Sequence, residues 1–436
     1  MNQQKSYTSS FILLTVLFFL WGFITVLVDS LIPRLRELFT LTYFQAGLVQ
    51  FAFFGAYFLL SIPASYILSK IGYKKGIILG LLTMATGCLL FYPAASYRVF
   101  GIFMLAYFIL AGGMTILQVA ANPFVAVLGS EASASSRLNL SQAFNSLGTA
   151  IAPAVGALFI LSDTIKTKDE IAALSETAKE TYLASEASAV QMPFLGLALF
   201  IGLIALIFLF AKLPTLMNET SSGTYSAALK NKNLMLGVLG IFFYVGAEVA
   251  IGSYLVNYFL DMNLVAVIKE NGLMKSIAEG ILNSGLTDND NKAIVGVFVT
   301  FYWSGAMIGR FVGSYLTKIM KPGKVLGIFA TCAILLILIS ISTTGLVSMW
   351  SILAVGLFNS IMFPTIFTIS IDGLGELKPK ASGLLCTAIV GGALIPPLYG
   401  FFTDVVGFKT ALLFIIACYA YILFFGYRNL KKTTHA

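Results

Sequence analysis

Long apolar stretches separated by short polar ones dominate this chain. An α-helix crosses the roughly 30 Å hydrocarbon core of a bilayer with about 20 apolar residues, and twelve stretches reach that length. The sequence therefore predicts an all-α polytopic membrane protein with twelve transmembrane helices. The predicted spans are residues 10–33, 42–69, 75–95, 99–128, 138–161, 192–211, 234–260, 294–316, 324–344, 348–374, 382–403 and 409–427.

The two halves of the chain resemble each other. Three short matches recur in the same order, separated by about half the chain length: 65–71 with 314–319, Pro123 with Pro364, and 148–156 with 391–400. Such a repeat predicts two pseudo-symmetric six-helix bundles, the layout of major facilitator transporters. We expect the bundles at 1–211 and 234–436, joined by a polar cytoplasmic linker at 212–233.

Composition supports a membrane protein and excludes several other classes. Of the 436 residues, 58% are hydrophobic and 11% are charged, whereas about a quarter of a soluble domain is charged. There is no G-x-x-x-x-G-K-[ST] loop for ATP, and the one histidine, His435, lies in the C-terminal tail. We therefore expect neither an enzyme nor a bound cofactor.

Charge is distributed unevenly across the predicted membrane. With both termini in the cytoplasm, 17 of the 27 lysines and arginines fall inside, and 13 of the 19 acidic residues fall outside. This asymmetry follows the positive-inside rule, so the net charge of +8 indicates topology and not a nucleic-acid partner. The partners we expect are a lipid bilayer and a small solute, and we expect a monomer.

Three further features have structural interpretations. The four cysteines stand alone in apolar runs and are predicted to be buried free thiols. The acidic outer segments 162–191 and 261–293 are each predicted to hold a short surface helix. Five prolines predict softened helices beside a moving cavity, with plain packing as the alternative: Pro123, Pro153, Pro364, Pro396 and Pro397.

The first span carries a polar stripe. Trp21, Thr25 and Asp29 follow one another at intervals of four, so they share one face of a helix. A carboxylate inside a membrane costs about 2.5–3.5 kcal/mol and usually faces a cavity or partner. We therefore expect this face to meet a ligand. The alternative is that Asp29 reaches the outer interface or pairs with Arg34 or Arg36.

Carboxamides are dense in the fourth and fifth spans. Gln118 and Asn122 share one helix face, and Gln142 and Asn145 share another. Each amide offers donors and acceptors together, which suits adjacent sugar hydroxyls better than an ion or a lipid. Hydrogen bonds between helices, worth about 0.6 kcal/mol each in membranes, are the alternative.

The second half supplies another candidate set. Glu248 is the second carboxylate inside a span, and aromatic rings beside carboxamides suit the flat apolar face of a pyranose. Arg310, Arg137 and Asp372 are placed at cytoplasmic span ends, as gate or loop contacts. The candidates for substrate binding in this half are Tyr244, Glu248, Asn257, Trp303 and Asn359.

Several motifs together resemble the fucose–galactose–glucose:proton symporter family of the major facilitator superfamily. The matching stretches are FFLWG…D…IP in the first span, FQAGLVQFAFFGAYF (44–58), AANPFVAVLG (120–129), RLNLSQAFNS (137–146), YVGAE…SYL (244–255) and FPTIF (363–367). The resemblance implies sugar uptake by alternating access. It also implies that Asp29 is the protonatable carboxylate and that Gln142 and Asn145 bind sugar.

The chain departs from the family at one position. Fucose-transporting members carry a glutamate in the fourth span where this chain has Gln118, while the seventh span with Glu248 is more similar to the glucose/galactose branch. This difference argues against fucose as the substrate and against a two-carboxylate proton pathway. Gln118 either binds sugar or completes an oxygen cage for sodium with Asp29.

These observations predict cation-coupled uptake of a neutral hexose across the inner membrane. Asp29, Glu248 and Gln118 are the expected coupling residues, and Trp21, Thr25, Gln118 and Asn122 are expected to bind sugar with the residues named above. Burial favours the neutral form of a carboxyl, so a co-transported proton is preferred and sodium at Asp29 is the alternative. Uniport or export of another small neutral solute also remains open.

Overall fold

The computed structural model describes residues 7–38, 43–160, 173–215, 224–287 and 289–430. Side chains are described in the same ranges except at 29–38, 43–47, 50, 154–160, 183, 186 and 188–190. Every regular element in these ranges is a helix. The predicted all-α class is confirmed.

Ten segments of the described chain are long and apolar enough to cross a membrane. One of them, Phe51–Tyr97, has 47 residues, or about 70 Å at 1.5 Å per residue, which is twice the need of one crossing. Gly72 divides it with φ 80° and ψ 168°, a conformation that only glycine adopts readily. These two crossings and α4 (Ala134–Ile160, 27 residues) complete twelve spans.

The chain divides into two compact units. Their boundary lies between Asn231 and Lys232, but two short segments join the unit of the opposite half: 131–143 belongs to the second unit and 373–387 to the first. The division therefore differs from simple halves at these two places. The bundle limits 1–211 and 234–436 remain a prediction.

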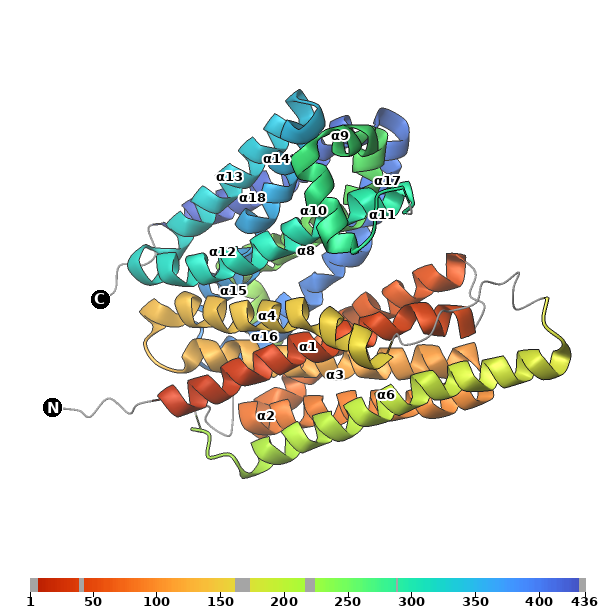
Figure 1. The fold of residues 1–436 in the computed structure, drawn as a ribbon. Coiled ribbons are helices and arrows are strands. Elements are labelled where there is room, and N and C mark those ends of the chain that lie inside the picture. Colours follow the sequence, from red (N-terminus) through yellow and green to blue (C-terminus); the bar gives the residue numbers. More distant parts are fainter. Residues whose placement is uncertain (1–6, 39–42, 161–172, 216–223, 288, 431–436) are drawn as a thin grey trace. The chain divides into compact units, whose positions relative to one another are not determined.

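The first unit contains most of the helices coloured red to yellow-green in Figure 1, together with the green α7 and the blue α16. Within it, α2 packs against both α3 and α6. Lys74 of α2 donates to the carbonyl oxygens of Leu209 (2.9 Å) and Ala211 (2.8 Å), so a cation caps the carbonyl end of α6. The helices are α1 (Thr8–Leu38), α2 (Tyr43–Tyr97), α3 (Phe100–Val127), the later part of α4, α6 (Glu176–Phe210), α7 (Tyr225–Lys230) and α16 (Lys378–Thr387), with the short 3₁₀ turn η2 (Gly375–Leu377).

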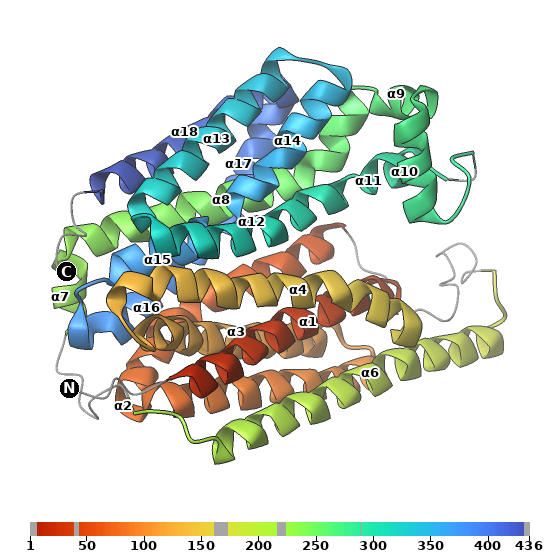
Figure 2. The ribbon, with the colours of Figure 1, turned by 60° about the vertical axis from the view of Figure 1, so that its left-hand side comes forward.

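The second unit contains most of the helices coloured green to blue. In Figures 1 and 2, α13 lies beside both α14 and α18. Its elements are η1 (Glu131–Ser133), the start of α4, α8 (Lys232–Asp261), α9 (Leu264–Glu270), α10 (Gly272–Leu282), α11 (Asn291–Gly296), α12 (Val299–Ile319), α13 (Pro322–Ser342), α14 (Gly345–Asn359), α15 (Met362–Ile371), η3 (Ala388–Val390), α17 (Gly391–Val406) and α18 (Phe408–Arg428).

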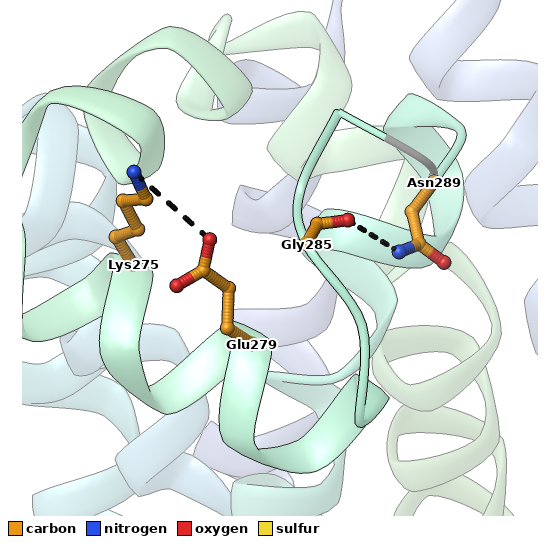
Figure 3. A network of polar contacts seen from close by, with 4 residues as sticks. All are labelled: Lys275, Glu279, Gly285 and Asn289. Atoms are coloured by element: carbon orange, nitrogen blue, oxygen red, sulfur yellow. Dashed lines mark hydrogen bonds and ion pairs between the residues drawn. The ribbon is translucent and has the colours of Figure 1, made fainter.

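The segment 261–293 holds the short helices α9 and α10, as predicted. Figure 3 shows how it is held: Lys275 and Glu279 pair along α10 at 4.0 Å, and the Asn289 amide donates to the Gly285 carbonyl at 2.9 Å. The corresponding prediction for 162–191 is wrong within its described residues, because the helix that begins at Glu176 continues unbroken into the sixth span.

Pro123 frees a carbonyl group inside α3. A proline has no N–H to donate to the residue four before it, which leaves the Val119 carbonyl without its usual helical partner. The hydroxyl of Ser382 on α16 donates to this oxygen at 2.8 Å. Segment 373–387 thus supplies a donor that α3 itself lacks.

Pro364 lies beside a helix break in the second unit. It is in the first turn of α15, where an N–H group has no partner in its own helix, and the span is broken just before it, between Asn359 and Met362. The break leaves the Ser360 carbonyl without a helical donor, and the Arg310 guanidinium donates to it at 3.2 Å. Near each of the two repeated prolines, a carbonyl group therefore accepts from a donor on another helix.

Two glycines allow α1 and α4 to touch backbone to backbone. A Cβ atom added to Gly22 would lie 2.2 Å from the Asn145 carbonyl oxygen, and one added to Gly148 would lie 2.2 Å from the Phe19 carbonyl oxygen. Small residues at such crossings are the usual device for close helix packing in membranes. The contact sets how the polar face of α1 meets α4.

We predict that Gly22→Ala destabilises the protein by about 1–3 kcal/mol, because the added methyl group forces α1 and α4 apart. Thermal unfolding of the purified protein in detergent measures this loss. Gly55→Ala is the matched control, since nothing lies within 4 Å of a Cβ at that position of α2. Equal melting temperatures for the two variants would contradict the close contact.

Candidate functional site

The contact between α1 and α4 brings Asn145 to the polar face of α1. The Asn145 amide nitrogen donates to the Phe18 carbonyl oxygen at 2.9 Å, and the side chain is half-buried. Its oxygen remains directed away from that bond. Asn145 is thus held by the backbone of α1 and keeps an acceptor for a ligand.

Trp21 and Thr25 occupy the same face of α1. Trp21 is 8% exposed and meets the Phe18 ring edge to face, with centroids 5.6 Å apart. The Thr25 hydroxyl donates to the Trp21 carbonyl at 2.9 Å and lies 4.0 Å from the Met114 sulfur of α3. Thr25 of the predicted stripe therefore faces α3 within the first unit.

Asp29 continues α1 one turn beyond Thr25. Its side chain lies outside the described residues, and so do those of Arg34 and Arg36. The structure places its backbone in the helix and no more. The cation-coupling role of Asp29 remains a prediction.

Gln118 and Asn122 lie in the buried part of α3. Asn122 is fully buried and Gln118 is 8% exposed. The Gln118 side-chain oxygen accepts a hydrogen bond from the Tyr57 hydroxyl of α2 at 2.9 Å. Tyr57 was not among the residues that the sequence singled out.

Gln142 groups with the second unit. Its side chain is 7% exposed, and its backbone carbonyl accepts from the Arg310 guanidinium at 3.3 Å. Gln142 and Asn145, predicted as one sugar-binding pair, are thus assigned to different units although both lie on α4.

Arg310 lies in the middle of α12 and not at its cytoplasmic end, so the predicted placement is wrong. Apolar residues continue on both sides of it, and the span extends to Ile319. Its guanidinium lies within electrostatic range of Glu248 and Tyr244 on α8. Glu248 is half-buried and Tyr244 is buried. The Glu248 carboxyl group is therefore under the electrostatic influence of a guanidinium on a neighbouring helix.

Asn359 is the centre of a buried hydrogen-bond chain. The Tyr419 hydroxyl of α18 donates to its oxygen at 2.6 Å, and its nitrogen donates to the Tyr302 hydroxyl of α12 at 2.6 Å. Tyr302 then donates to the Glu248 carbonyl at 3.5 Å. All three linked side chains are 0% exposed, so both ends of the Asn359 amide hold the unit together.

The other two candidates of the second half are exposed. Trp303 is 49% exposed, and its ring covers Gly252 of α8, where an added Cβ would lie 2.9 Å away. Asn257 is exposed on α8. The structure does not bring either one into the chain of tyrosines around Asn359.

No group of three or more His, Cys, Asp and Glu side chains that could hold a metal ion occurs among the described residues. The four cysteines are free thiols, as predicted, with Cys332 half-buried and the others buried. The polar groups that the described residues assemble are amides, hydroxyls and a carboxyl group within electrostatic range of a guanidinium. This chemistry suits a neutral, hydroxyl-rich ligand.

Comparisons with known proteins agree with this chemistry. A family model described as Major Facilitator Superfamily matches residues 7–388. A protein of Brucella abortus biovar 1 (strain 9-941) named "Glucose/galactose transporter" is 46% identical over 428 residues, which cover 98% of this chain and 95% of that protein. The "L-fucose-proton symporter" of Escherichia coli (strain K12) is 37% identical, with 98% and 94% covered.

A solved structure shows the same fold. The crystal structure of the transporter FucP in the outward conformation matches with a TM-score of 0.86 and 36% identity, and the match covers 98% of this chain and 99% of that one. The similarity extends over nearly the whole length of both chains.

We predict that Asn359→Leu destabilises the protein by about 1–3 kcal/mol, because the buried Tyr419 hydroxyl loses its acceptor, whereas Tyr302 keeps its bond to the Glu248 carbonyl. The measurement is thermal unfolding in detergent, with Asn257→Leu as the control because that asparagine is exposed on a neighbouring helix. If both variants unfold at the wild-type temperature, the chain from Tyr419 to Tyr302 contributes nothing to stability.

Proposed function

Because the chain belongs to the major facilitator superfamily, whose members are membrane transporters and not enzymes, we propose that it takes up a neutral hexose by cation-coupled alternating access. Glucose and galactose are the proposed substrates, and the proton is the preferred coupling ion. The observation that carries this proposal is the 46% identity to a protein named "Glucose/galactose transporter" over 98% of this chain.

The polar groups of the first unit support a sugar as substrate. Trp21 offers a ring, and Gln118 and Asn145 offer amides. Close packing of α1 against α4 fixes the distance between the helices of Trp21 and Asn145. A sugar needs both donors and acceptors for its hydroxyls and an apolar surface for its ring. In the second unit, Glu248, Tyr244, Asn257 and Trp303 remain proposed substrate contacts, as does Gln142 of α4. Asn359 is the weakest of the proposed contacts, because both ends of its amide are engaged.

Accumulation of a neutral sugar requires a coupled ion, since the membrane potential does no work on an uncharged solute. One elementary charge crossing 100 mV provides about 2.3 kcal/mol, enough for about 50-fold accumulation. We assign this role to Asp29. Neutralised from the outside, it allows the loaded carrier to close, and it releases its cation inside. Glu248 is the second candidate, with Arg310 as its positive neighbour.

Sodium in place of the proton is the alternative coupling ion. The name of the E. coli relative includes a proton, and an isolated carboxyl in a membrane favours protonation; both support the proton. We further propose that the chain is a monomer in the bacterial inner membrane with both termini in the cytoplasm. The distribution of basic residues supports this orientation.

We predict that the wild-type protein in liposomes exchanges labelled glucose and galactose in counterflow and accumulates them only with an ion gradient. A panel of hexoses, measured with and without sodium and across pH, identifies the substrate and the ion. With proton coupling, lowering the outside pH raises accumulation and sodium has no effect. Accumulation of no hexose under any gradient would refute uptake, and insensitivity to both ions would indicate a uniporter.

We predict that Asp29→Asn still exchanges labelled sugar but no longer concentrates it, because the amide stays neutral through the whole cycle. Counterflow and gradient-driven uptake in the same liposomes separate the two activities. Asp404→Asn is the matched control, since Asp404 is exposed near the end of α17. Normal accumulation by the Asp29 variant would remove this residue from the coupling site.

A further inference from the structure

The hydroxyl of Tyr57 fixes the direction of the Gln118 amide. It donates to the Gln118 oxygen at 2.9 Å, across the interface between α2 and α3. Tyr57 is 3% exposed and Gln118 is 8% exposed, so water has little access to compete for this bond. Among the described residues, Tyr57 is the hydrogen-bond partner of the Gln118 side chain that the structure provides.

Tyr57 is itself held firmly. Its ring contacts Phe53 with centroids 5.3 Å apart, and Phe53 in turn contacts Tyr107 of α3 at 6.3 Å. The ring is packed among other rings, which leaves the phenol little freedom to move. The position of the hydroxyl is therefore a property of the packed unit and not of a mobile side chain.

This bond fixes which end of the Gln118 amide faces Tyr57 and which end faces away from it. The bond to Tyr57 occupies one of the two acceptor sites of the Gln118 oxygen and turns the NH₂ group, which donates hydrogen bonds and does not bind cations, to the other side of the amide. Sodium is bound by oxygen, so an oxygen cage that includes Gln118 would have to use the remaining acceptor site of an oxygen that faces Tyr57. The geometry therefore favours the sugar-donor role of the two that the sequence left open for this residue.

Gln118 also lies beside the polar face of α1. Met114 precedes it by one turn on the same face of α3, and the Met114 sulfur contacts the Thr25 hydroxyl. The Asn145 amide is turned the other way, because one of its N–H groups donates to the Phe18 carbonyl and its oxygen points away from that bond. The first unit thus presents one amide as a donor and another as an acceptor.

We propose that Tyr57 is a positioning residue that holds Gln118 as a hydrogen-bond donor to one oxygen of the transported sugar. This inference rests on the proposed hexose transport. It adds a specificity role for Gln118 and a residue, Tyr57, that contacts no substrate and acts through the amide.

The test is sugar counterflow in proteoliposomes with glucose and its 2-, 3-, 4- and 6-deoxy analogues. Wild-type protein is compared with Gln118→Met, with Tyr57→Phe and with the control Tyr73→Phe. Tyr73 is a buried tyrosine that stacks on Phe124 across the same pair of helices. Melting temperatures verify that each variant is folded, and Gln118→Asn replaces Gln118→Met if the latter does not fold.

We expect one analogue to bind wild-type protein about three- to tenfold more weakly than glucose, the loss of one neutral hydrogen bond. Gln118→Met weakens the binding of glucose by a similar factor and does not further weaken the binding of that analogue. Tyr57→Phe also weakens the binding of glucose relative to that same analogue, because the freed amide can rotate. The dependence of uptake on protons or sodium stays as in wild type, and Tyr73→Phe keeps the wild-type profile.

Two results would overturn the inference. A changed cation affinity or sugar-to-ion ratio in the Gln118 or Tyr57 variants, with an unchanged analogue profile, would place Gln118 in the ion site. An equal loss of binding for glucose and all analogues in the Gln118 variant would show that Gln118 hydrogen-bonds no particular oxygen of the sugar. Either result leaves hexose transport standing, whereas a wild-type protein that exchanges no hexose refutes the proposed function itself.

Discussion

Every backbone polar group inside a bilayer has to find its partner within the protein, and this constraint explains the most specific contacts of the structure. Pro123 deprives the Val119 carbonyl of its helical donor, and the helix break before Pro364 leaves the Ser360 carbonyl without one. The Ser382 hydroxyl satisfies one of these carbonyls and the Arg310 guanidinium the other. Each half of the chain therefore has a carbonyl group that lacks a helical donor near a proline, and the two carbonyls accept from donors of different kinds. In each unit this hydrogen bond joins another helix to the span that contains the proline.

The same constraint distinguishes the carboxamide side chains by which of their ends are hydrogen-bonded within the protein. Asn359 has both ends engaged by tyrosines, and it serves as a fixed joint between α12, α14 and α18. Gln118 and Asn145 each have one end engaged, and the engaged ends are of opposite kind. An amide with one end hydrogen-bonded within the protein is held in one orientation and can still hydrogen-bond a ligand with its other end. The same side chain then contributes both to helix packing and to ligand binding.

The fold could be predicted from the sequence because hydropathy is a local property. Twelve apolar stretches and the repeat suffice for the topology, and even the break at Gly72 falls between two predicted spans. The acidic segment before the sixth span was misjudged because its helix from Glu176 is polar at the start and apolar at the end, so no local signal marks where a surface helix would stop.

The site could be predicted only in part. The residue types of the first unit were foreseen, but not the partners that orient them, because a tyrosine such as Tyr57 or Tyr419 looks like any of the many aromatic residues of a membrane helix. Charge alone suggests an interface for Arg310, whereas its guanidinium donates to the Ser360 and Gln142 carbonyls and lies within electrostatic range of Glu248. These contacts depend on which helices are neighbours in the fold. The hydrophobic periodicity of the sequence does not reveal those neighbours.

The exchange of segments 131–143 and 373–387 between the units has a consequence for how the chain is made. The first unit includes a piece that the ribosome synthesises some 140 residues after the linker, so the early half leaves the translocon without its full set of neighbours. During this interval, the Val119 carbonyl lacks the hydrogen bond that Ser382 later donates to it. Assembly of the first half is thus completed only when nearly the entire polypeptide has been inserted, and a fragment that stops at the linker lacks a component of its own unit.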